Sequence, residues 1–242
     1  MKIFIDSVIP LESGLSSGKA LATAAAILSM HANNFHSKVD KIKFSNYLKE
    51  GLKFIQNKNY QEISSENSKT FNDKNFEGYS FVIANSLTPA SHFAGLNTRY
   101  NKRVLELRIA TILLSIEYDK NHSIIHPQSC PHKTLIEFQK SNNFSFEEMI
   151  DFINSKLRKG GYSKSQVEEA LNSDDVVIDL NDTQYIYEVW QNNYKFFIHE
   201  RAIHVITEAQ RVQEFLEQTT FLPEKFGKLM DESQKSLKEN FD

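Results

Sequence analysis

The sequence contains little cysteine, glycine or proline, and each shortage excludes a class of protein. Among its 242 residues there is one cysteine, Cys130. It cannot form a disulfide within the chain, which excludes a disulfide framework and fits a reducing compartment such as the cytosol. Eight glycines and five prolines are below their usual shares. A chain so poor in turn residues is expected to contain more helix than sheet.

The chain also lacks an excess of charge and a long hydrophobic run. Its 28 basic and 31 acidic residues give a net charge of −3, so no general basic surface is available for nucleic acid. The longest apolar run, residues 20–30, is shorter than the ~20 residues of a membrane span, and Asp6 and Glu12 precede it where a signal peptide is basic. We therefore expect a cytoplasmic protein without nucleic-acid or membrane partners.

The first ninety residues combine strand patterns with one strong helix. Residues 3–9 alternate and are rich in isoleucine, which predicts a strand that leads into a loop at residues 10–18. A helix is expected from about Ser17 to Ala32, with two asparagines after it as terminators. Residues 79–87 form an apolar run of strand length that ends in Asn-Ser, which predicts a buried strand.

Beyond residue 97 the pattern is helical. Apolar residues recur every three or four positions over residues 104–114 and predict a helix with one buried stripe. Residues 145–157 and 163–173 each open with a serine followed by acidic or amide residues, as capped helices do. A similar stripe predicts one long helix over residues 182–218, and Pro223 is a favourable first residue for the last helix.

The loop before the first helix is a candidate phosphate site. A helix N-terminus exposes unpaired N–H groups and the positive end of its dipole, which together favour an anion. Gly14 and Gly18 allow the backbone to approach a ligand, Ser16 and Ser17 supply hydroxyl groups, and Lys19 adds a cation. A serine-capped helix that binds nothing explains the same residues.

A P-loop does not fit this segment. The stretch from Gly14 to Lys19 has one residue too few between its glycines, and Ala20 stands where a serine or threonine must bind magnesium.

Four segments, in the correct order, resemble the galactokinases among the GHMP small-molecule kinases. GLSS before an alanine-rich helix resembles the family's phosphate-binding GLSSSAA. The other three are FVIANSL with NTRYNKRVLELR, FIHERAIHVITEAQRV at residues 197–212, and FGKLMDESQKSL after it. SFEEMI and YSKSQVEEALN look closest to the eukaryotic branch that includes N-acetylgalactosamine kinase.

The resemblance implies an α+β fold of the GHMP kinase type. It implies a partial S5-like, ATP-binding half over residues 1–88 and the helical part of a C-terminal domain over residues 89–242. It also implies ATP-dependent phosphorylation of galactose or N-acetylgalactosamine at the anomeric hydroxyl, with Mg²⁺ as cofactor. Tyr100 is the sugar contact by this comparison, although a tyrosine that caps a helix on the core explains it too. The implied ATP and phosphate ligands are Gly14, Leu15, Ser16, Ser17, Gly18 and Lys19.

The sequence departs from the family at the residues that carry the chemistry. Gly18 replaces the serine that reaches the metal in the family. The family's catalytic aspartate, in a GGMDQ motif, is absent, as though a segment between Phe44 and Leu48 had been removed. By the same comparison, the family's sugar-recognition loop is expected before residue 1 and its GAGxGG motif after residue 242. We therefore assign no catalytic residue and keep three alternatives: an active kinase, an inactive relative that binds nucleotide or a partner, and an incomplete gene product.

Two other groups of polar residues are open to a functional interpretation. His122, His126, Cys130 and His132 can all bind zinc, but two prolines interrupt them and their spacing matches no known finger, so we assign no metal ligand. In the last long helix, His204 is expected to be a hydrogen-bonded core residue. Its charged neighbours are expected to pair with one another on a solvated face: Arg201, Glu208 and Arg211. The oligomeric state is not indicated.

Overall fold

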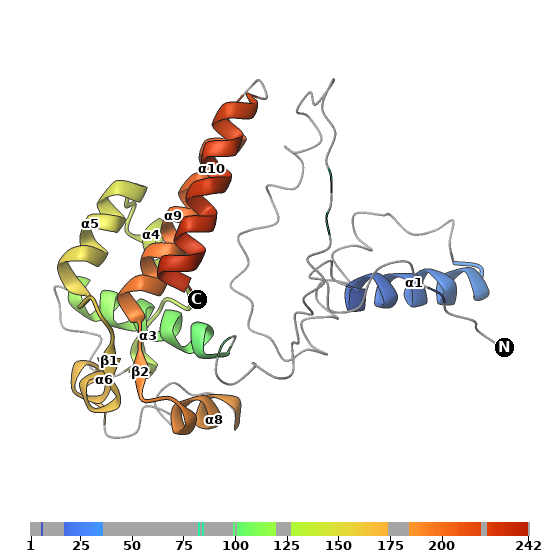
Figure 1. Ribbon diagram of the computed structural model, residues 1–242. Helices are drawn as coiled ribbons and strands as arrows, with labels where there is room; N and C mark the ends of the chain where they lie inside the picture. The colour runs from blue at the N-terminus through green and yellow to red at the C-terminus, as the bar shows by residue number, and fades with distance from the viewer. Residues whose placement is uncertain are drawn as a thin grey trace. The chain divides into compact units, whose positions relative to one another are not determined.

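The computed structural model describes residues 6, 17–35, 82, 84, 99, 101–119, 127–173, 184–218 and 222–241. The chain forms two compact units, one from residues 1–61 and 80–94 and the other from residues 62–79 and 95–242. The second, which we call the helical unit, contains all described helices except α1 (Figure 1). A mainly helical structure with one small sheet is compatible with the predicted α+β class.

Helix α1 covers Ser17–Ala32, as predicted. It ends where the Asn33 amide donates to the Ser29 carbonyl, and Asn34 then takes a left-handed conformation with φ of 58°. Asparagine tolerates this conformation better than most residues, which explains why the helix stops there.

The predicted buried strand over residues 79–87 is wrong at its two described positions. Neither Val82 nor Ala84 belongs to a strand, and Val82 is 88% exposed. A strand is buried only when neighbours pair with it and cover its faces, and no described residue does so here. Of the strand predicted over residues 3–9, only Asp6 falls within the described part.

Helix α3, Asn101–Tyr118, is the centre of the helical unit. It packs against α4, α5, α6, α8 and α9, which surround it. The predicted helix is confirmed, but more of its surface is buried than the single stripe that was predicted. Ten residues between positions 105 and 115 are buried, so the helix is covered on every side there, as a core helix is. They are Leu105, Glu106, Leu107, Ile109, Ala110, Thr111, Ile112, Leu113, Leu114 and Ser115.

The two serine-capped helices are present as predicted. Helix α5, Phe146–Lys156, has a capping box in which the Ser145 hydroxyl accepts from the Glu148 amide and the Glu148 carboxylate accepts from the Ser145 amide. Helix α6, Lys164–Leu171, repeats this arrangement with Ser163 and Gln166. A shorter helix, α4, covers Leu135–Ser141.

Replacing Ser145 with alanine should lower the free energy of unfolding of the helical unit by about 1 kcal/mol, because the substitution leaves the Glu148 amide without its side-chain partner. Urea denaturation measures the change. Ser155→Ala, in the last turn of the same helix, is the control. The Ser155 hydroxyl only donates to the Phe152 carbonyl three residues earlier, so its removal should cost little. Equal losses in both variants would contradict the capping argument.

The single helix predicted over residues 182–218 is wrong, because two helices are found there with a strand between them. They are α8, Gln184–Asn192, and α9, Ile198–Glu217, and the strand is β2, Lys195–Phe196. The Asn193 side-chain amide donates to the Val189 carbonyl and so competes with the next backbone bond of α8.

Strand β2 pairs antiparallel with β1, Tyr162–Ser163, with Tyr162 opposite Phe196. A glycine pair precedes β1, and both glycines have positive φ, 85° and 87°. The positive φ at Gly161 favours glycine, and a Cβ there would also lie 2.8 Å from the side chain of Lys195, which would have to move.

The last helix, α10, begins at Pro223 as predicted and covers Pro223–Ser236. A π-helical turn, η4, Leu237–Phe241, continues it, and both segments contact α9 (Figure 1). No described helix has the length and apolar character that a membrane crossing requires.

Candidate functional site

The structure describes little of the predicted phosphate and sugar sites. Gly14, Leu15, Ser16 and Tyr100 lie outside the described residues. Ser17, Gly18 and Lys19 are the first three residues of α1, and only their backbone is described. The helix therefore begins within the last residues of the glycine and serine segment, so its N-terminus falls where the phosphate hypothesis requires it. The role of these residues remains a prediction.

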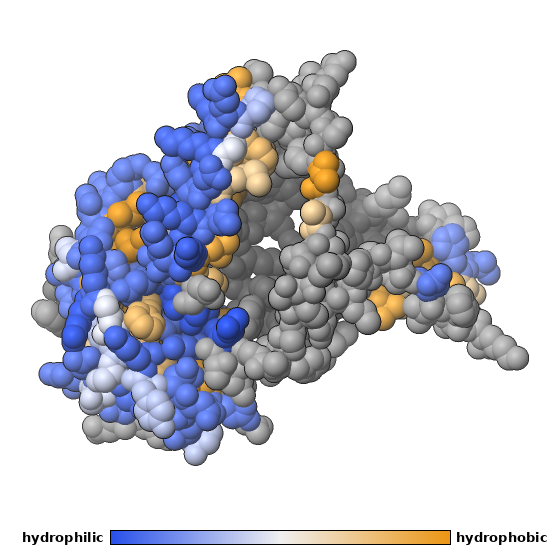
Figure 2. Space-filling view, in the orientation of Figure 1, coloured by the Kyte–Doolittle hydropathy of each residue, from blue (hydrophilic) through white to orange (hydrophobic). Residues whose placement is uncertain are grey.

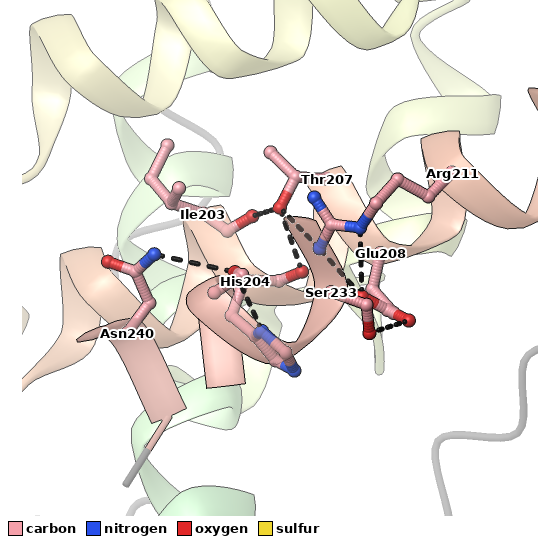
Figure 3. A network of polar contacts seen from close by, with 8 residues as sticks. Ile203, His204, Thr207, Glu208, Arg211, Ser233 and Asn240 are labelled. Atoms are coloured by element: carbon pink, nitrogen blue, oxygen red, sulfur yellow. Dashed lines mark hydrogen bonds and ion pairs between the residues drawn. The ribbon is translucent and has the colours of Figure 1, made fainter. Parts of the chain in front are cut away.

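The described residues bring together a different site, at the contact between α9 and α10 (Figure 3). The Ser233 hydroxyl of α10 donates to Glu208 Oε1 over 2.8 Å. The other oxygen of Glu208 pairs with Arg211 at 2.6 Å, and Arg211 also donates to the Thr207 hydroxyl. The predicted pairing of Glu208 with Arg211 along α9 is thus confirmed, and the hydrogen bond from Ser233 joins the pair to α10.

His204 is the buried member of this contact, with 6% of its surface exposed. Its Nδ1 lies 2.9 Å from the Ser236 hydroxyl, and its ring packs on Phe241 with 4.5 Å between centroids. This confirms the expectation of a hydrogen-bonded core histidine. Burial lowers the pKa of His204, and the carboxylate of Glu208 opposes only part of that effect.

His199, at the start of α9, is in a similar position. It is 6% exposed, its Nε2 lies 3.0 Å from Asn154 Oδ1, and burial lowers its pKa. Both histidines are therefore neutral in the folded protein at pH values where the unfolded chain, with a histidine pKa of about 6.5, already takes up protons.

Acidification should consequently destabilise the helical unit. Below about pH 6.5 the unfolded state binds more protons than the native state, so the stability falls until the lowered folded pKa values are reached. Urea midpoints between about pH 7.5 and 5.5 measure the fall. The variant His204→Gln should lose less stability than the wild type over the same pH range. A stability that stays constant or rises on acidification would contradict the assignment.

Arg201 does not lie on the solvated face that was predicted for it. It is 3% exposed, and its Nε donates to Glu106 Oε2 at 3.0 Å. Glu106 is fully buried and 95 residues away in the sequence. The prediction failed because helical spacing identifies neighbours on the same helix and not partners on another. The sequence feature that could have indicated this ion pair is Glu106, a glutamate within the apolar stretch of α3.

An open groove also runs between α9 and α10. It has a volume of about 420 Å³, and the polar groups at its edge include Glu208 and Arg211. On the face seen in Figure 2, the described part of the chain is mostly hydrophilic with separate hydrophobic patches. The apolar groove residues are Val212, Phe215, Phe226, Leu229, Met230 and Leu237.

The two described members of the possible zinc group have protein partners. His132 Nδ1 lies 3.1 Å from the Ser115 hydroxyl, and the Cys130 thiol is 3.4 Å from the His132 carbonyl. His122 and His126 fall in the part that is not described. Within the described ranges, no three histidine, cysteine, aspartate or glutamate side chains come close enough to hold a metal ion.

No model of a known protein family matches the chain. It is, however, 26% identical to a galactokinase of Dictyostelium discoideum over 97% of its own length. It is also 25% identical to a galactokinase of Candida parapsilosis over 98% of its length. The chain is related to galactokinases. It spans about half the length of these curated relatives, 52% and 54%.

The alignment with the first galactokinase extends over 269 positions, more than the 242 residues of this chain. The galactokinase therefore has internal residues without a counterpart here. Extra internal residues in a galactokinase are consistent with a shortened chain, and the gap expected between Phe44 and Leu48 stays a prediction.

The contacts among α3, α9 and α10 are made by segments that resemble galactokinases. Three of the segments that resemble galactokinases supply Glu106, then Arg201, His204 and Glu208, then Ser233 and Ser236. These residues bind one another across α3, α9 and α10. In the helical unit, the galactokinase-like segments thus hold the helices together.

Proposed function

We propose that this chain is a galactokinase-type protein of the GHMP fold that binds ATP, with Mg²⁺, and a hexose. The candidate hexoses are galactose and N-acetylgalactosamine. Two curated galactokinases that match nearly the whole chain support the proposal. So does α1, which starts at Ser17 within the glycine and serine segment, where an anion can meet the free N–H groups of a helix.

Phosphoryl transfer should be slow or absent. A positioned general base contributes about 10²–10⁴-fold to such a reaction, and the aspartate motif that supplies it in the family is not in this sequence. Gly18 also removes a hydroxyl that the family uses for the metal. The observation that carries the proposal is therefore a segment that resembles the family's phosphate-binding loop, in a sequence without the family's aspartate motif.

An active galactokinase is the second candidate. It requires that one of the six carboxylates between residues 40 and 77 replaces the missing aspartate, and the names of the two relatives favour it.

Nucleotide binding tests the phosphate site directly. Lys19→Ala should weaken MgATP binding about three- to tenfold in a calorimetric titration, since it removes a cation beside the loop. Lys228→Ala, which removes an exposed lysine from α10, is the matched control and should leave binding unchanged. If the wild-type chain is folded and binds no nucleotide, the proposed function is wrong.

A further inference from the structure

Two large apolar residues of the last helical segment remain exposed beside the groove between α9 and α10. Met230 is 56% exposed and Leu237 is 46% exposed. Both line the groove, together with Phe215 of α9 and Phe226 of α10, whose rings lie 5.1 Å apart between centroids. Exposed apolar residues that gather beside a groove, rather than occurring singly, are typical of an interaction surface.

The exposed residues form one patch along the helix. Met230 and Leu237 are seven residues apart, which is close to two full turns, and Phe226 precedes Met230 by about one turn. Leu237 keeps α-helical backbone angles, with φ of −56° and ψ of −49°, so the spacing holds up to that residue. We call these three side chains the α10 patch.

A charged residue follows each exposed member of the α10 patch. Asp231 follows Met230, Lys238 follows Leu237, and both charged side chains are exposed. The ion pair described on this helix joins Lys228 to Glu232, and within the described part of the helical unit Asp231 and Lys238 take part in none. Because they are also seven residues apart, the two opposite charges lie on the same flank of the patch.

This spacing makes the α10 patch complementary to itself. When two copies of α10 lie side by side in opposite directions, the register that sets Met230 against Leu237 also sets Asp231 against Lys238. A two-fold axis repeats both contacts, since the same patch of each subunit meets in a symmetric dimer. In a parallel pair Asp231 would face Asp231, and like charges across an interface repel each other.

We propose that the chain forms a two-fold symmetric dimer in which the α10 patches of two copies pack antiparallel. The partner is a second copy of this chain, and the inference does not depend on nucleotide or sugar binding. A contact that is centred on a few apolar residues belongs to the small, weak class of interfaces. We therefore expect a dissociation constant of about 10–100 μM.

Sedimentation equilibrium of the purified, folded chain from about 5 to 500 μM tests the dimer. The average mass should rise from 27.9 kDa towards twice that value. Met230→Glu should weaken dimerisation at least about tenfold, because it places a carboxylate against Leu237 of the partner copy. Tyr187→Glu is the matched control, since Tyr187 is 55% exposed but lies on α8, and it should leave dimerisation unchanged.

Charge reversal tests the antiparallel register. Asp231→Lys and Lys238→Asp should each weaken dimerisation about three- to tenfold, because each replaces two attractive pairs with two repulsive ones. The double variant restores both pairs in the opposite sense and should dimerise within about twofold of the wild type. Such a rescue distinguishes a contact between two copies from an effect on the fold of one copy.

A chain that stays monomeric over this concentration range would overturn the proposal. A dimer that Met230→Glu weakens no more than Tyr187→Glu would overturn it as well, because the contact would then lie elsewhere. A double charge variant as weak as the single variants would contradict the antiparallel packing. Should circular dichroism show that Met230→Glu does not fold, the charge variants, which change only exposed side chains, still decide.

Discussion

Replacing Arg201 with alanine should lower the free energy of unfolding of the helical unit by about 3–5 kcal/mol. The substitution leaves the carboxylate of Glu106, which is fully buried, without its closest cation. It also removes the donor to the Asn240 carbonyl, so the segment after α10 loses a bond to α9. Urea denaturation, followed by circular dichroism, measures the loss.

Lys228→Ala is the control for this prediction. Lys228 pairs with Glu232 at 3.8 Å, but its side chain is 77% exposed, and exposed pairs contribute little. We expect a change of less than about 0.5 kcal/mol. If Arg201→Ala were as mild as Lys228→Ala, the buried ion pair would not be what holds α3 to α9.

Replacing Phe138 with alanine should cost about 3–5 kcal/mol, because it opens a cavity in the aromatic centre of the core. Phe138 is fully buried and contacts the rings of Tyr118, Phe144 and Phe152 at centroid distances of 5.8, 5.9 and 6.0 Å. The ring of His132 lies 5.3 Å away. The loss should appear in the urea midpoint and in the near-ultraviolet circular dichroism.

Two variants calibrate the Phe138 result. Phe138→Leu refills most of the space and should cost clearly less than alanine. Met230→Ala removes a side chain that is 56% exposed and should have little effect on stability. A loss that does not depend on the size of the new residue at position 138 would contradict the cavity argument.

Local signals in the sequence were sufficient for the elements that end or begin with a specific residue. Helix α1 was predicted with its correct bounds because an alanine-rich segment runs from the serine loop to two asparagines. The capping boxes at Ser145 and Ser163 were visible because their partners lie three residues away. Each of these features depends on a few neighbouring residues, so it can be predicted from a single sequence.

Contacts between distant segments could not be predicted in this way. The pairing of Tyr162 with Phe196 joins two segments that are far apart in the sequence, and neither segment indicates its partner. The bond between Arg201 and Glu106 turns an apparent surface arginine into a core residue. The order of the galactokinase-like segments identified the relationship, but it did not reveal that these segments bind one another.

Sugar-dependent ADP release by the purified, folded chain with MgATP and either galactose or N-acetylgalactosamine shows directly whether phosphoryl transfer is impaired. We expect turnover at least about a hundredfold below the 1–100 s⁻¹ of typical kinases, in a protein that still binds MgATP. Lys19→Ala, purified in the same way, controls for contaminating kinases. Sugar-dependent turnover in the usual range, lowered by Lys19→Ala, would show that another carboxylate serves as the base and would contradict the proposal of an impaired kinase.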